Sequence, residues 1–161
     1  MSRVVVNDLG WIRVKSDANK LAGYFIEAGL FADAISSDGE PLAQRGFYAE
    51  YGTQNAPARP WLSGGAEFVE RVALKEIARI VNQIGKLPSD PEALLKPLAK
   101  AIATGIQTYA IEGPFAPNAE STQKRKGFNW PLVETGEMVD AIDGRVRHTS
   151  KLRGAWSRLN Q

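Results

Sequence analysis

Residues 50–62 read EYGTQNAPARPWL, the most irregular and proline-rich segment of the first half of the chain. It has neither the period of a helix nor the alternation of a strand. Its glycine, asparagine, threonine and two prolines are typical of a turn followed by an extended hairpin arm. Proline fixes φ and pushes the preceding residue toward extended geometry, so the arm is stiff. The arm ends in Trp61 and Leu62, a large apolar anchor for either the chain's own core or another subunit.

The clearest periodicity lies just beyond this segment. Apolar residues recur at helical spacing from 65 to 84 and again from 91 to 112. Asp90 is a good N-cap for the second helix, and proline at the following position suits a first helical turn. Pro97 should bend this helix near its start. Because residues 85–88 (GKLP) form a short stop between them, the two helices are predicted to pair as an antiparallel hairpin.

Before the arm, the pattern is weaker. Residues 3–6 indicate a short strand or extended arm, and a short helix is expected over 16–23 with Ser16 or Asp17 as its N-cap. The segment 24–35 suits a strand, with a close backbone approach at Gly29. A turn over 36–41 follows, and 42–51 is ambiguous but compatible with a short helix.

After the hairpin, residues 113–131 are predicted to be a long polar loop. Thr135 is expected to cap a short helix that starts near Gly136. Asp143 and Gly144 indicate a turn, and 145–149 a strand. The tail, 150–161, shows no structure of its own, but its Trp156 is costly to leave in water and should dock on the core or on a neighbour.

Together these elements predict an α+β fold in one domain, 1–161. A small, mostly antiparallel sheet packs on the two-helix hairpin. Loops 50–64 and 113–131 project from it as long extended arms, and the C-terminal tail covers 150–161.

Composition excludes several classes of function. The chain has 161 residues, 43% of them hydrophobic, a net charge of +2, no cysteine and one histidine. Disulfides and thiolate metal sites are thereby excluded, and a reducing cytoplasm is the expected place of synthesis. No apolar run approaches the roughly 18 residues of a membrane helix, and the first residues do not resemble a signal peptide.

Nothing in the sequence indicates catalysis. His148 lies in a basic stretch without a serine or carboxylate motif around it, so we interpret it as a solvated surface residue. We interpret the carboxylates Glu67, Glu70 and Glu76 as the solvent-exposed face of a helix rather than as an acid–base pair. The glycines before this helix lack the lysine and Ser/Thr of a phosphate loop. We therefore expect no enzyme activity, catalytic residue, cofactor or metal.

Two blocks of residues carry a family resemblance. The first is EYGT at 50–53 followed by PARPWL at 57–62; the second is PFAP at 114–117 followed, after Ser121, Thr122 and basic residues, by PLVETGEM at 131–138. Together they resemble the motifs of small neck and tail-completion proteins of tailed bacteriophages and prophages. Trp61 stands where phenylalanine is commoner, and residues 133–134 are Val-Glu where Ile-Asp is commoner, but both changes keep size and charge.

The resemblance implies a structural virion protein of the phage neck, made in the host bacterial cytoplasm. It would act in head–tail connection and tail completion. Copies would form a ring, expected to be hexameric, between the portal, adaptor or head-completion proteins and the tail terminator or tail tube. Non-specific contact with DNA in the channel is compatible with this place, and no membrane is involved. Closed rotational symmetry requires that one patch on each copy meets a different patch on the next.

The residues expected to contact partners belong to the two motif blocks, the basic loop and the tail. They are Glu50, Tyr51, Thr53, Arg59, Pro60, Trp61, Leu62, Phe115, Lys124, Lys126, Trp130, Leu132, Thr135, Met138 and Trp156.

Two of these assignments have alternatives. Arg59 is either a surface side chain of a proline-rich turn, alone or paired with Glu50, or a contact that the stiff arm presents to a partner. The resemblance favours the partner contact, because Arg and Trp dominate interface energetics. The basic residues 124–126 form either a solvated loop, a protein contact or a lining for a DNA channel. Because three charges are few, the protein contact is favoured over DNA.

Two other functions compete with the neck assignment. One is a tail terminator or another minor virion-morphogenesis protein. The other is a small DNA-binding protein, which only the basic C-terminal third favours.

Overall fold

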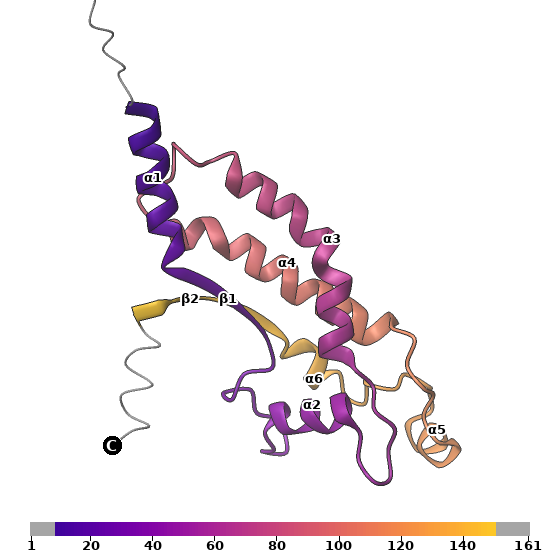
Figure 1. Ribbon diagram of the computed structural model, residues 1–161. Helices are drawn as coiled ribbons and strands as arrows, with labels where there is room; N and C mark the ends of the chain where they lie inside the picture. The colour runs from indigo at the N-terminus through magenta and orange to yellow at the C-terminus, as the bar shows by residue number, and fades with distance from the viewer. Residues whose placement is uncertain (1–8, 151–161) are drawn as a thin grey trace, which may run out of the picture.

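The computed structural model describes residues 9–150 and confirms the α+β class (Figure 1). The expected strand at 3–6 and the tail with Trp156 lie outside the described residues. Within them, no helix is both long and apolar enough to cross a membrane. The elements in chain order are α1 Leu9–Ala22, β1 Tyr24–Gly29, α2 Leu42–Tyr51, α3 Trp61–Val81, α4 Pro91–Glu112, α5 Glu120–Lys126, α6 Glu137–Asp140 and β2 Asp143–His148.

The hairpin of α3 and α4 is the centre of the fold, as predicted. Asp90 caps α4, since its carboxylate accepts hydrogen bonds from the main-chain N–H groups of Glu92 (3.0 Å) and Ala93 (3.3 Å). The helix continues through Pro97. α3 begins at Trp61, four residues before the predicted start, because its first N–H groups find their acceptor outside the helix, on Glu50.

The sheet is a two-stranded antiparallel ribbon that packs on α4. Its register runs from Tyr24 opposite His148 to Gly29 opposite Asp143. A turn at 143–144 was therefore the wrong prediction, because both residues already belong to the strand. The close backbone approach lies at Gly144, where a Cβ atom would overlap the carbonyl group of Ala99 in α4. Only glycine lets the ribbon lie this close to the helix.

Helix α1 starts earlier than the sequence indicated, and Asp17 is not its N-cap. The side chain lies in mid-helix and accepts hydrogen bonds from Gly85 N (2.9 Å) and Leu87 N (3.2 Å), with Lys20 3.1 Å away. These bonds from Leu87, Lys20 and Gly85 lower the pKa of Asp17, although its burial acts in the opposite direction. Asp17 therefore ties α1 to the connection between α3 and α4.

Neither projecting loop is a long extended arm. Residues 50 and 51 are the last of α2, and Gly52, at φ 75°, is its C-cap. Residues 61–64 already belong to α3. The second loop contains α5, a helix that the polar composition of 113–131 concealed. The short helix near Gly136 forms as predicted, but Thr135 is not its N-cap: Gly136, in the left-handed region at φ 88°, takes that position, and no side chain caps the helix.

The buried core has two parts along the hairpin. The larger part joins Trp61 and Val69 of α3 to one side of α4 and to Val139 and Ile142 near α6. The smaller part consists of Ile80, Leu94 and Leu98, with half-buried residues of α1 and β1 packed against it. The larger part holds the two motif blocks together.

The substitution Gly144→Ala tests the contact between ribbon and helix. Because the added methyl group overlaps the backbone of Ala99, we expect the free energy of unfolding to fall by about 1–3 kcal/mol or more. Chemical denaturation measures this change. Gly10→Ala in α1, which has open space around it, is the control and should leave stability unchanged or slightly higher. Equal stability of both variants would contradict the close approach.

Candidate functional site

The two motif blocks meet at Arg59. Its Nε donates to the carbonyl oxygen of Ala116 at 3.1 Å, and its Nη2 donates to Pro117 O and to Asn118 Oδ1, both at 3.3 Å. Its main-chain N–H donates to Ala49 O of α2 at 2.8 Å. Arg59 therefore holds α2, the 52–60 loop and the start of the second block together. We call this contact region the motif junction.

Asn118 is the second centre of the motif junction. Its buried side chain accepts from Arg59 and donates from Nδ2 to Trp130 O at 3.3 Å. Its main-chain N–H donates to Asn129 Oδ1 at 3.0 Å, and its carbonyl accepts from Gln123 Nε2 at 2.6 Å. The side-chain oxygen, the amide N–H₂ and both main-chain groups of Asn118 thus have partners, which fixes α5 and residues 129–130 relative to Arg59.

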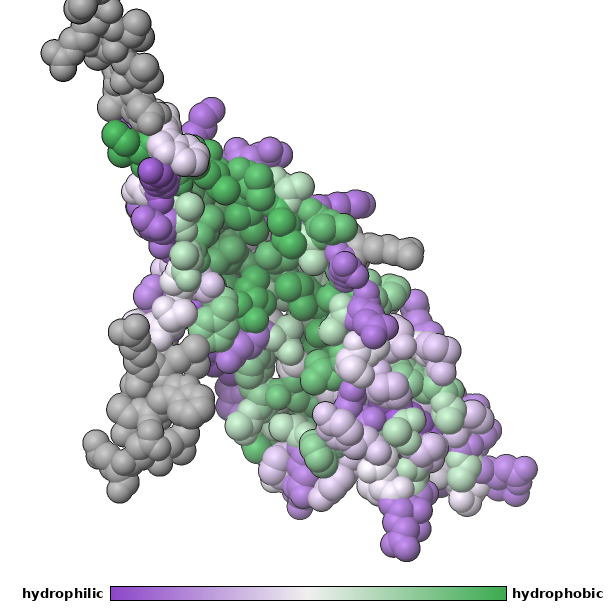
Figure 2. All heavy atoms as spheres, viewed as in Figure 1, coloured by the Kyte–Doolittle hydropathy of each residue, from purple (hydrophilic) through white to green (hydrophobic). Residues whose placement is uncertain are grey.

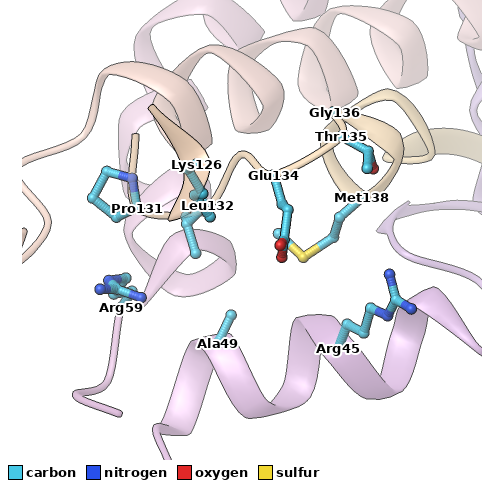
Figure 3. A pocket seen from close by; sticks show the side chains of 10 residues that line it. All are labelled: Arg45, Ala49, Arg59, Lys126, Pro131, Leu132, Glu134, Thr135, Gly136 and Met138. Atoms are coloured by element: carbon cyan, nitrogen blue, oxygen red, sulfur yellow. The ribbon is translucent and has the colours of Figure 1, made fainter. Parts of the chain in front are cut away.

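A recess of about 160 Å³ opens between α2 and the second block (Figure 3). Arg59 and Arg45 lie toward opposite ends of it, and Glu134 points into the space between them. Lys126 reaches across from α5 and donates to Val133 O at 2.8 Å. The lining residues are Arg45, Ala49, Arg59, Lys126, Pro131, Leu132, Glu134, Thr135, Gly136 and Met138.

The recess carries excess positive charge. Arg45 is paired with Asp38, whose pKa falls to about 2 because of its bonds to Ser36 and Arg45, and Glu134 is paired with Arg125. Within residues 9–150, Arg59 and Lys126 have no such carboxylate partner and bond only to carbonyl and amide oxygens. Burial lowers the pKa of both groups. The recess is therefore suited to an anionic group such as a partner's carboxylate.

Trp61 lies in the core of its own chain, which corrects its assignment as an anchor for a partner. Its side chain is only 2% exposed, and its indole Nε1 donates to Gly46 O at 2.9 Å. Glu50 likewise serves its own chain, since its carboxylate accepts from Leu62 N (2.8 Å) and Ser63 N (3.1 Å) and caps α3. Glu50 is thus not the partner of Arg59.

The other predicted contact residues divide into two groups. Phe115 packs edge-on against Tyr109 and against the core. Leu132 and Met138 are half-buried beside the recess, so all three side chains contact mainly their own chain. The side chains that the structure leaves at the surface are Tyr51, Thr53, Pro60, Leu62, Lys124, Trp130 and Thr135.

A second hollow lies on the other side of α2. This groove of about 430 Å³ runs between α2 and the start of α3, and its lining is mostly apolar. Phe47 and Tyr51, whose rings lie 4.8 Å apart, form its exposed wall, and Leu62 and Trp61 line it from α3. A groove with exposed aromatic walls is typical of a protein-binding surface.

Comparison of the chain with protein-family models, with curated proteins and with solved structures found no match. Among the described residues, no cluster of three or more His, Cys, Asp or Glu side chains is placed to hold a metal ion.

Sequence reasoning missed Asn118 and the aromatic residues Phe47 and Tyr48. Nothing in the sequence marks Asn118, because its partners lie up to 59 residues away. The α2 aromatics did leave a signal. Phe47 and Tyr51 are four residues apart, so a helix over 42–51 puts them on one face, and Leu42 and Gly46 on the buried face.

The substitution Trp61→Ala tests whether this residue is core. Loss of a buried indole should lower the free energy of unfolding by about 3–5 kcal/mol, measured by denaturation of the purified protein. The control is Trp130→Ala, which removes the same side chain from a site 57% exposed and should change stability by less than about 0.5 kcal/mol. A Trp61→Ala variant as stable as the parent would contradict the core position and restore the assignment of Trp61 as an anchor for a partner.

Proposed function

We propose that the chain is a structural virion protein of the phage neck, which acts in head–tail connection and tail completion. The observation that carries the proposal is the motif junction. The two blocks that resemble the neck and tail-completion family lie far apart in sequence, yet Arg59 and Asn118 join them into one rigid unit. Two motif blocks that meet at one site support a shared function more strongly than two short motifs that lie apart in the structure.

The surface around the motif junction supports an assembly function. Phe47, Tyr48 and Tyr51 of α2 are exposed on one side, and Phe128 and Trp130 are exposed beyond α5. Aromatic side chains of this kind are costly to leave in water, and Tyr and Trp are among the residues that contribute most at interfaces. The electropositive recess between these two groups adds a site for an acidic side chain of a partner.

In this proposal, copies form a hexameric ring in the neck of the virion, after synthesis in the host bacterial cytoplasm. The aromatic end with α2 and α5 meets the portal-side or head-completion proteins or the tail terminator and tail tube. No catalytic residue, cofactor or membrane takes part. The alternative within the same class is a tail terminator or another minor virion-morphogenesis protein.

A DNA-binding function is less well supported by the charges. Of residues 124–126, Arg125 is paired with Glu134, and Lys126 is half-buried and bonded to Val133 O. Phosphate binding requires several cations that reach outward together. Recessed cations beside the half-buried, apolar Leu132 and Met138 suit a carboxylate on an aliphatic stem better than a nucleic-acid backbone.

The test is the particle that the purified protein forms, studied by negative-stain electron microscopy together with gel shifts on duplex DNA. We expect closed rings with a central channel, either alone or after addition of tail tubes, and no duplex binding at low salt. Open filaments, or a monomer that binds duplex DNA in a salt-dependent way, would contradict the neck proposal and favour the DNA-binding alternative.

A further inference from the structure

The outward side of α3 carries an apolar stripe that nothing in the described chain covers. Leu74, Ile77 and Val81 repeat at three- and four-residue spacing and are all exposed. Figure 2 shows apolar side chains gathered along α3 and α4, whereas hydrophilic ones dominate the end near α5. One and two turns before the stripe, Glu70 and Glu67 are exposed on the same side of the helix.

Helix α1 is complementary to this stripe. Val14, Asp17 and Leu21 turn toward the body of the molecule, and Asp17 fixes that side to residues 85–87. Its N-terminal half carries Trp11 and Ile12, both more than half exposed. Arg13 and Lys15 follow within one turn, and the ammonium group of Lys15 lies 5.2 Å from the centre of the Trp11 ring.

We propose that α1 of one copy packs on the outer face of α3 of a second copy. Antiparallel packing places Trp11 and Ile12 on the apolar stripe. The same alignment carries Lys15, which lies on the same side of α1 as Trp11, toward Glu70, because the apolar-to-charged order runs forward along α1 and backward along α3. This pairing of opposite charges, added to the match in apolar surface, is the reason to assign a second copy.

The contact joins different patches on the two copies. Within one chain, the bonds of Asp17 to Gly85 and Leu87 hold α1 beside the connection that follows the C-terminal end of α3. A contact of one patch with a different patch repeats from copy to copy and closes into a ring when the rotation allows. The closure of the copies into a ring rests on the proposed function. The pairing of α1 with α3 of a second copy does not depend on that function.

Charge reversal tests the pairing. Mass photometry or light scattering across a concentration series measures self-association of the parent, of Lys15→Glu, of Glu70→Lys and of the double variant. Each single reversal should raise the concentration for half-assembly about tenfold, and the double variant should return close to the parent value. The effect of the single changes should weaken at high salt.

Apolar substitutions provide a matched pair. Ile77→Ser, in the stripe, should weaken association by about tenfold or more, whereas Ile111→Ser, at the other end of the hairpin, should not change it. Both isoleucines are 44% exposed, so the two variants carry the same risk to folding, which circular dichroism checks.

The outcomes separate this contact from the proposed function. A parent that stays monomeric at every concentration overturns the contact, as does assembly that the single reversals leave unchanged. If rings form but ignore the reversals, the contact fails while the neck proposal stands. If the reversals act as expected but the species is a filament or a closed dimer, the contact is supported and the ring fails.

Discussion

The hydrogen bonds of Arg59 to Ala116 O, Pro117 O and Asn118 Oδ1 are the constraint on which the motif junction depends. A guanidinium offers several donors in a fixed plane, so one side chain orders three acceptors on a segment that has little apolar surface of its own. Arg59 is half-buried, and this burial lowers the pKa of its guanidinium. Removing it would leave the side-chain oxygen of the buried Asn118 without this partner, and an unpaired buried acceptor is costly.

Acceptors supplied from distant residues recur elsewhere in the fold. Glu50 of α2 caps α3, and Asp17 of α1 binds the N–H groups that connect α3 to α4. These bonds explain where sequence-based prediction succeeded and where it failed. The α3–α4 hairpin and the Asp90 cap were predictable, because their signals are periodic or local. The start of α3 and the role of Asp17 were not, because each depends on a partner that only the folded chain brings near.

In the candidate site too, some residues could be identified from the sequence, but their contacts could not. The sequence marked Arg59, Lys126 and the 131–138 block but assigned them outward, to a partner. In the folded chain Lys126 binds the carbonyl oxygen of Val133 in that block, Arg59 binds residues 116–118, and Trp61 is buried. The proline-rich composition that indicated a stiff arm is equally compatible with a short connection between two helices. The exposed surfaces left for partners are the aromatic side chains of α2 and of residues 128–130 at one end of the molecule, and the apolar stripe along α3. These two surfaces can serve different contacts.

The most direct test of the account is amide hydrogen exchange across residues 113–134 in the parent and in Arg59→Ala, with Arg45→Ala as the control, since Arg45 also lines the recess but pairs with the exposed Asp38. If Arg59 joins the two blocks, exchange in α5 and at the N–H of Asn118 becomes faster by about tenfold or more in Arg59→Ala, and Arg45→Ala leaves it close to the parent. Equal protection of residues 113–134 in the parent and in Arg59→Ala would contradict the account.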